Sequence, residues 1–268
     1  MNNHITIFLS FSFYILCTIL LILRARQHPL LSKTPKSLIL LVGMFGLAAQ
    51  VLSIHIGVHH PSGINLGFYN ALSIISAFIT LFTFITAFRY AIETLLIVIL
   101  PITMLTMVLD LNFTSSHILS PDSSDALLFH VMSSLVAYSV LALAALLAIL
   151  LSIQNRYLHN HQPSGVISRL PPLKTMECIL FEALTFGFIC LSMSLATGLL
   201  FLDNMFAQQL AHKTILSIIA WFVFLTLLIG RWALGWRGRI AIRWTLVGFF
   251  SLMLAYFGSK FVLEVLMK

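Results

Sequence analysis

The sequence predicts an all-α polytopic membrane bundle of about eight transmembrane helices, and three observations point to it. Of the 268 residues, 60% are hydrophobic and only 9% are charged, whereas soluble domains are about half apolar and about a quarter charged. So few charges could not cover a surface that faces water. A helix that spans a bilayer needs about 20 apolar residues, and the apolar residues suffice for about eight such helices. We expect one integral-membrane domain over residues 1–268.

Apolar runs along the chain give the expected helices in order. They are Ile5–Leu23, Leu38–Val58, Leu66–Phe88, Leu95–Leu109, Ala126–Ser152, Ile179–Leu202, Ile215–Leu234 and Ile240–Leu263. No Lys or Arg precedes the first run, unlike in a secretory signal, so we expect it to be retained as a helix. The fourth run is the shortest and contains Pro101, which membrane helices tolerate at a kink.

The segments between these runs are expected to be loops. Three outer loops are expected at about 59–65, 110–125 and 203–214, and the second would carry Asp110, Asp122 and Asp125. The longest inner loop, 153–178, contains the pair Pro171-Pro172 and is expected to be irregular. None of these loops is long enough to form a separate soluble domain.

The basic residues predict how the chain crosses the membrane. Of the 15 Lys and Arg residues, 12 lie in the segments 24–37, 89–94, 153–178 and 231–243, all on one side. Cytoplasmic loops are enriched in Lys and Arg, so both termini are expected outside a bacterial inner membrane. The net charge of +7 then needs no nucleic-acid partner, and no basic patch with interleaved aromatics indicates RNA or DNA binding.

Ionisable groups at membrane depth are costly, so each is a functional hypothesis. His55 and His130 are expected near the outer ends of the second and fifth helices, and His212 at the outer start of the seventh. Two neutral imidazoles from different helices can ligate one haem iron. Other roles stay open, because His55 could reach lipid headgroups and His212 could be a solvated loop end. Glu182, one turn into the sixth helix, is expected to be an acid that snorkels to the interface or is hydrogen-bonded, rather than a proton relay.

His130 begins a polar stripe in an otherwise apolar helix. Ser133, Ser134 and Tyr138 follow it at positions i+3, i+4 and i+8, which places them on one helix face. Such a stripe should face the protein interior. It is consistent with a ligand site, and also with a polar seam that joins helices by hydrogen bonds, as Ser and His often do in membranes.

The sequence contains no motif of a known catalytic site. Cys17, Cys178 and Cys190 form no C-x-x-C pair, and no nucleophile elbow, zinc-protease helix or phosphate-binding glycine loop is present. We therefore expect a protein that is not an enzyme.

Short stretches along the chain carry a resemblance to a known family. They read NLGFYNALS at 65–73, FHVM at 129–132 followed by Tyr138, LPPLKTME at 170–177, HKT at 212–214 leading to AWF at 220–222, GWRGR at 235–239 and AYFG at 255–258. In this order and spacing, over about residues 40–260, the chain resembles the cytochrome c assembly proteins, the CcsA-like and HemX-like membrane proteins.

The resemblance implies a membrane protein that handles haem for cytochrome c maturation. It implies that His130 matches an outer histidine that contacts haem, and that His55 or His60 matches a second one. The full haem-attachment proteins carry a tryptophan-rich segment before the helix that starts here near Thr214. Residues 203–211 contain no tryptophan, so an accessory role is expected rather than a haem lyase.

These observations predict a haem b-binding accessory protein with His130 and His55 as ligands and His212 as a third candidate. The expected partners are the lipid bilayer, haem and other cytochrome c maturation proteins. One alternative is a divalent-metal transport or tolerance factor that uses the same histidines with Asp122 and Asp125. Another is a membrane scaffold whose histidines are structural.

Overall fold

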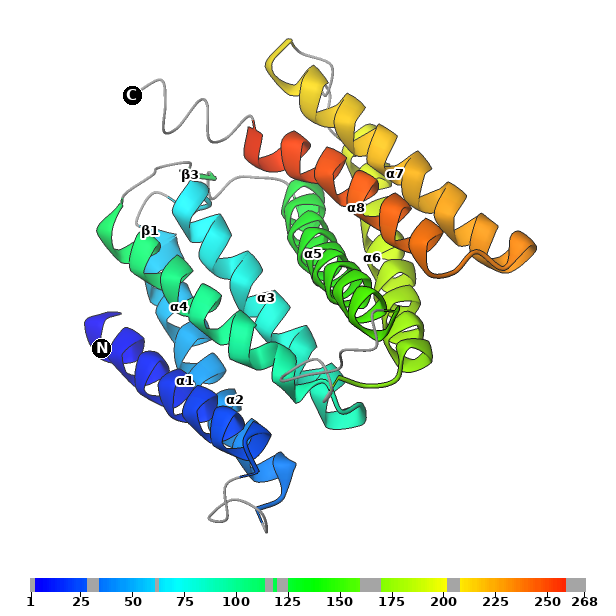
Figure 1. Cartoon of the computed structure of the whole chain (residues 1–268). Helices are drawn as coiled ribbons and strands as arrows, with labels where there is room; N and C mark the ends of the chain where they lie inside the picture. Colours follow the sequence, from blue (N-terminus) through cyan, green and yellow to red (C-terminus); the bar gives the residue numbers. More distant parts are fainter. Residues whose placement is uncertain are drawn as a thin grey trace. The chain divides into compact units, whose positions relative to one another are not determined.

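The computed structural model describes residues 3–27, 34–60, 63–113, 118–119, 125–159, 170–201 and 208–258 (Figure 1). Within these residues, 8 helices are long and apolar enough to cross a membrane, as predicted. They are α1 (Asn3–Ala25), α2 (Lys36–Val58), α3 (Phe68–Arg89), α4 (Leu96–Asn112), α5 (Asp125–His159), α6 (Leu173–Phe201), α7 (Gln208–Leu234) and α8 (Arg239–Met253). The short 3₁₀ turn η2 (Glu93–Leu95) precedes α4, and the π-helical turn η4 (Leu254–Gly258) follows α8.

The chain divides into two compact units. The N-terminal unit comprises residues 1–121 with 162–171, and the C-terminal unit comprises 122–161 with 172–268. The first therefore holds α1–α4 and the second holds α5–α8. The expectation of a single domain stays a prediction.

In the N-terminal unit, α1 packs on α2 and α4, and α3 packs on α2 and α4. Glycines in α2 let α1 and α3 approach closely, as small residues do between membrane helices. A Cβ atom on Gly43 would lie 2.3 Å from Cζ of Phe84, and one on Gly46 would lie 2.8 Å from Cδ1 of Tyr14. Phe84 and Tyr14 are both fully buried and form the centre of this unit.

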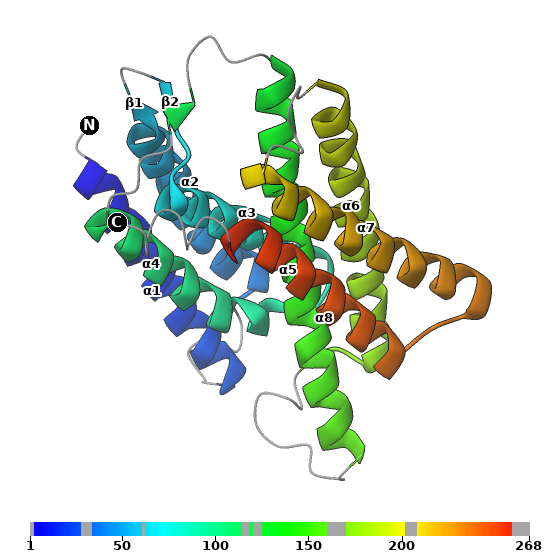
Figure 2. The same ribbon diagram turned by 90° about the horizontal axis from the view of Figure 1, so that it is seen from above.

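A small antiparallel sheet joins the loops of this unit, which the all-α prediction did not include. Its strands are β1 (His59–His60), β2 (Gly63–Asn65) and β3 (Ile118–Leu119), in the order β1-β2-β3. His59 pairs with Ile64, and Ile64 pairs with Leu119. Figure 2 shows β1 and β2 beyond the end of α2. The strands are only two or three residues long, too short to give a period-2 pattern in the sequence.

In the C-terminal unit, α5 is the most buried span and packs against α6 and α8. Its middle is rich in alanine, and Ala137, Ala144 and Ala148 are buried there. Helix α7 packs against α6 and α8, and α7 and α8 lie side by side in Figures 1 and 2. The turn between α7 and α8 uses Gly235 and Gly238 at φ values of 66° and 54°, a region that glycine adopts without strain.

Several predicted loop boundaries are wrong, because hydropathy marks the lipid-crossing part of a helix and not its end. Helix α5 continues to His159 and α6 begins at Leu173, so both ends of the segment 153–178 are helical, while 160–169 lie outside the described residues. Asp110 lies inside α4 rather than in a loop, and Asp125 is the first residue of α5. Helix α7 begins at Gln208, inside the predicted loop 203–214.

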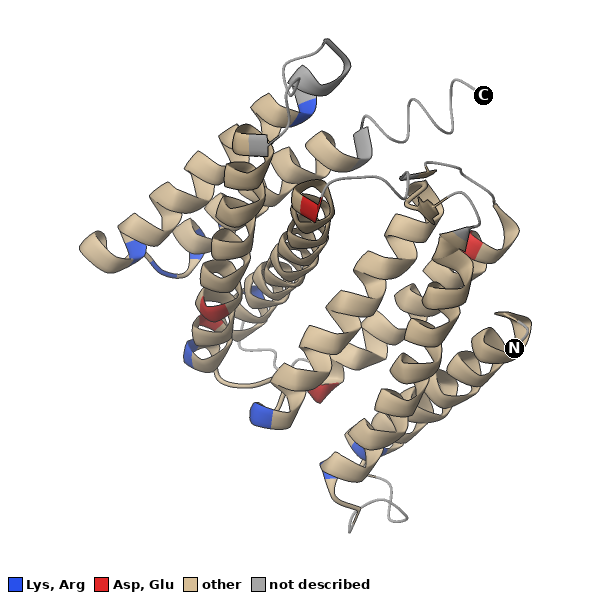
Figure 3. Cartoon of the chain, turned by 180° about the vertical axis from the view of Figure 1, so that it is seen from behind, with Lys and Arg blue, Asp and Glu red and all other residues tan. Residues whose placement is uncertain are grey.

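Most of the described basic residues lie at one end of each unit (Figure 3), while Lys213 lies near the opposite end of α7 from Arg231. Because successive helices run in opposite directions, the end of α1, the start of α2 and the end of α3 meet, and these carry Arg24, Lys36 and Arg89. The corresponding end of the C-terminal unit carries Arg156, Lys174, Arg231, Arg239 and Arg243. Asp110 and Asp125 lie at the ends of α4 and α5 that are far from these basic residues. This placement agrees with the predicted topology, while the side on which the termini lie stays a prediction.

Candidate functional site

His130 lies in the second turn of α5, and its ring is fixed by the neighbouring helix. Its Nδ1 is 2.7 Å from the carbonyl oxygen of Ser194 in α6. A carbonyl oxygen only accepts hydrogen bonds, so Nδ1 carries the proton and Nε2 has the free lone pair. Ligating histidines in metal and haem proteins are usually held in this way, with one ring N–H on a carbonyl and the other nitrogen on the metal. Among the described residues, none forms a hydrogen bond with Nε2.

The serines that follow His130 connect the same two helices. The Ser134 hydroxyl donates to the His130 carbonyl oxygen at 2.5 Å and lies 2.7 Å from the Ser194 hydroxyl. Ser133 donates to the His130 carbonyl oxygen at 3.0 Å. These hydrogen bonds agree with the interpretation of the stripe as a polar contact between helices, whereas the interpretation as a ligand site stays a prediction. Nδ1 and Ser134 join α5 to α6, while Nε2 is free to bind a ligand.

Tyr138, the last member of the stripe, belongs to a different contact. Its ring lies 5.4 Å from Phe249 of α8 and 5.5 Å from Tyr256 of η4, measured between centroids. It is buried and packs the middle of α5 against the last helix. The stripe thus serves the α6 contact near the start of α5 and the α8 contact towards the middle of that helix.

The surface beside His130 is apolar. Leu128, Phe129 and Met132 on α5 are exposed large apolar side chains, and His130 itself is half-buried. A porphyrin needs an apolar surface around a nitrogen ligand, and both are present here. The residues at this position therefore fit a haem group.

His55 and His59 form a pair at the end of α2. The two rings are 4.2 Å apart between centroids, and Nδ1 of His59 donates to the His55 carbonyl oxygen at 2.7 Å. Both side chains are exposed. His60 is in β1, but its side chain lies outside the described residues. Because His55 and His130 belong to separate units, their predicted pairing at one iron stays a prediction.

The other two candidate residues, His212 and Glu182, both lie in helices. His212 lies in the first turns of α7, and its side chain lies outside the described residues. Glu182 is exposed on α6, in its third turn because that helix begins earlier than predicted.

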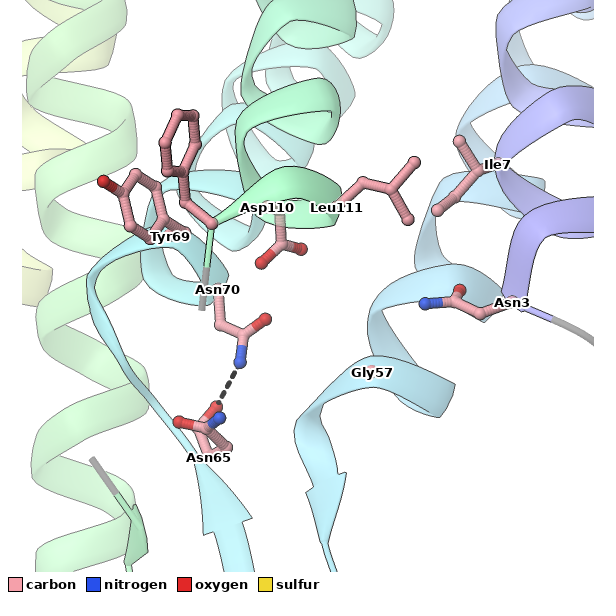
Figure 4. A pocket seen from close by; sticks show the side chains of 9 residues that line it. Asn3, Ile7, Gly57, Asn65, Tyr69, Asn70, Asp110 and Leu111 are labelled. Carbon is pink, nitrogen blue, oxygen red and sulfur yellow. Dashed lines mark hydrogen bonds between the residues drawn. The ribbon is translucent and has the colours of Figure 1, made fainter. Parts of the chain in front are cut away.

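A polar pocket in the N-terminal unit was missed because Asp110 was assigned to a loop. The cavity of about 210 Å³ opens between the ends of the helices and is lined by Asn3, Asn65, Tyr69, Asn70 and Asp110 together with Ile7, Gly57, Leu111 and Phe113. Figure 4 shows the Asp110 carboxylate beside the Asn70 side chain. The Asn70 amide donates to the Asn65 carbonyl oxygen at 3.2 Å. The pocket therefore offers one carboxylate among neutral amide groups.

Below this pocket, buried hydrogen bonds connect all four helices of the unit. The Tyr14 hydroxyl donates to Oε1 of Gln50 at 2.7 Å, and the Gln50 amide donates to the Ser76 hydroxyl at 3.3 Å. The Ser76 and Thr106 hydroxyls are 2.7 Å apart, and those of Thr80 and Thr103 are 2.8 Å apart. Since each of these hydroxyls has a partner, these six residues fix the register of the four helices.

Replacing Gln50 by leucine is expected to lower the free energy of unfolding by about 1–2 kcal/mol, because it leaves the buried Tyr14 hydroxyl without an acceptor. Unfolding by SDS titration in mixed micelles measures the change. The double variant Gln50→Leu/Tyr14→Phe is expected to recover most of the loss, because both partners are then apolar. A double variant as unstable as Gln50→Leu would contradict this assignment.

The described residues contain no group of three or more His, Cys, Asp or Glu side chains that could hold a metal ion. The metal alternative predicted Asp122 and Asp125 beside the outer histidines. Asp125 is at the start of α5, and Asp122 lies outside the described residues. Among the described residues, His55 and His59 at the end of α2 are a pair of neighbouring imidazoles, which is fewer groups than a metal site of three ligands needs.

The sequence is similar to known membrane proteins. The family model described as cytochrome C assembly protein matches residues 6–267. The inner membrane protein YpjD of Escherichia coli K12 is 32% identical over 205 residues, which cover 76% of this chain and 78% of that protein. An uncharacterised 28.8 kDa protein of Azospirillum brasilense is 33% identical over 140 residues, or 52% of each chain. No solved structure matches significantly.

Proposed function

The chain belongs to the cytochrome c assembly protein family as a multi-pass inner-membrane protein, and from this premise we propose that it handles haem b as an accessory protein in cytochrome c biogenesis. The proposed role is non-catalytic. It consists of holding haem at the outer end of the C-terminal unit, for exchange with other maturation proteins in the same membrane.

The observation that supports this proposal is the orientation of the His130 ring. With Nδ1–H bonded to the Ser194 carbonyl oxygen at 2.7 Å, Nε2 is the nitrogen that would hold the iron. Bound haem would supply a redox-active iron, and the exposed Leu128, Phe129 and Met132 would cover the porphyrin edge.

A second histidine that would hold the haem is proposed among the remaining predicted histidines. His212 belongs to the same unit as His130, and His55 belongs to the N-terminal unit. Replacement of each by alanine would identify it, because loss of one imidazole ligand would shift the absorption spectrum of any haem that stays bound.

The first test is a reduced-minus-oxidised absorption spectrum of the full-length protein purified in detergent. We expect a Soret band that shifts on reduction and about one b-type haem per chain in a pyridine haemochrome assay. A preparation without haem, even when haem is supplied during expression, would contradict the proposal.

A divalent-cation role is the second candidate, and the close pair of His55 and His59, with ring centroids 4.2 Å apart, favours it. Zinc titration of the purified protein tests this role, beside the variant His55→Ala/His59→Ala. Zinc binding that is lost in this variant, in a protein that carries no haem, would favour metal tolerance. If neither haem nor zinc binds, a membrane scaffold becomes the better explanation.

A further inference from the structure

A second cavity lies in the C-terminal unit, where α5 ends and α8 begins. It has a volume of about 420 Å³ and is lined by Ser152, Asn155, Arg156 and His159 of α5 and by Arg239, Ile242 and Arg243 of α8. We call it the basic pocket. It lies at the opposite end of α5 from His130, so it is separate from the proposed haem site.

The charges of the basic pocket are all of one sign. Arg156, Arg239 and Arg243 are exposed and line one small cavity, and no acidic side chain is among its lining residues. In the part of the chain that the structure describes, these arginines form no hydrogen bond or ion pair with a carboxylate. Three like charges in one cavity repel one another, and a bound anion would relieve that repulsion.

The start of α8 adds a further attraction for an anion. The first N–H groups of a helix have no acceptor within the helix, and the helix dipole places partial positive charge there. Arg239 is the first residue of α8, and Ile242 and Arg243 are in its first turns. The nearby Glu177 carboxylate does not line the cavity and accepts the Gly238 N–H at 2.8 Å. The Gly238 amide is therefore occupied, and the three arginines supply the main attraction for an anion.

The position of the pocket along the helices indicates the source of the anion. Leu147 and Leu151 of α5 are buried in the apolar part of the bundle, and the polar residues Ser152 and Asn155 follow. Ile149, Ile240 and Val247 on the same two helices are exposed apolar side chains, as expected for a surface that contacts acyl chains. The cavity is thus at the boundary between the apolar span and water, which is the depth of lipid headgroups.

We propose that the basic pocket binds the phosphate group of an anionic membrane lipid. The planar guanidinium groups of Arg239 and Arg243 match phosphate oxygens in a two-pronged geometry. Ser152 and Asn155 supply neutral hydrogen-bond donors from α5, and the acyl chains lie along the exposed isoleucines. Basic pockets between membrane helices on the cytoplasmic side are suited to such headgroups, and the predicted topology places this end of α5 there.

The test uses the full-length protein in a neutral detergent at fixed salt concentration. Dioleoyl phosphatidylglycerol, dioleoyl phosphatidylcholine and inorganic phosphate are titrated separately, and native mass spectrometry with thermal unfolding reports binding. We expect phosphatidylglycerol to bind and to raise the unfolding temperature, while the zwitterionic lipid and inorganic phosphate do neither. The double variant Arg239→Gln/Arg243→Gln is expected to bind phosphatidylglycerol about twenty-five-fold more weakly, since each arginine near a lipid surface contributes about fivefold.

Arg237→Gln is the matched control, because Arg237 is exposed beside α8 but does not line the cavity. It removes a charge from the same segment and is expected to leave lipid binding unchanged. Arg156→Gln, on α5, is expected to weaken binding about fivefold, and it provides a second variant if the double variant fails to fold. Equal binding of the two lipids, equal protection by inorganic phosphate, or unchanged binding in the pocket variants would each overturn the proposal.

Discussion

Alanine at His130 is expected to remove the haem absorption of the purified protein almost completely. Replacing a residue that only orients a metal ligand already costs about 10–100-fold in affinity, and His130 is proposed as the ligand itself. The haem content per chain should therefore fall by more than tenfold. The pyridine haemochrome assay measures it in wild type and variant, at equal protein concentration.

His159→Ala is the control for this variant, because His159 is an exposed histidine at the far end of the same helix. It should retain haem. His130→Gly with added imidazole separates ligation from packing. If Nε2 binds the iron, imidazole in the vacated space should restore the spectrum, whereas a purely structural histidine would not be rescued in this way. Full haem content in His130→Ala would show that His130 is not a ligand.

The sequence could predict His130 but not its orientation. An ionisable group in an apolar helix is unusual enough to be recognised from one chain. Its partner, the Ser194 carbonyl oxygen, is 64 positions further along the sequence, and every residue has such a carbonyl. No residue pattern distinguishes that one, so the free Nε2 is a result of the way α5 packs on α6.

Asp110 and the basic pocket were missed for a related physical reason. The apolar run of the fourth helix ends at Leu109, but the backbone hydrogen bonds continue, and the Phe113 N–H still bonds the Leu109 carbonyl oxygen at 2.9 Å. In the same way α5 continues past Ser152 to His159. Helices extend beyond the hydrocarbon into the interface, where polar side chains are tolerated. Asp110 of α4 and Asn155 and Arg156 of α5 lie in these last turns, which hydropathy assigns to loops.

The second large effect is expected at Gly43, where α2 meets both α1 and α3. A Cβ atom there would lie 2.3 Å from Cζ of Phe84 and 2.9 Å from Sγ of Cys17. Both neighbours are fully buried, so neither ring nor thiol has free space to move into. Gly43→Ala is therefore expected to separate the helices and to lower the free energy of unfolding by about 1–3 kcal/mol, as measured by SDS titration.

Gly57→Ala in the same helix shows whether packing or backbone freedom causes this loss. A Cβ atom at Gly57 would meet only Nδ2 of Asn3, at 3.6 Å, which is ordinary contact. Alanine is favoured over glycine in a helix by up to about 1 kcal/mol, so Gly57→Ala should be neutral or slightly stabilising. Phe84→Leu combined with Gly43→Ala should recover part of the loss, because leucine lacks the ring edge that the new methyl group meets. If both glycine variants changed stability alike, helix propensity rather than the close approach of α1, α2 and α3 would govern this position.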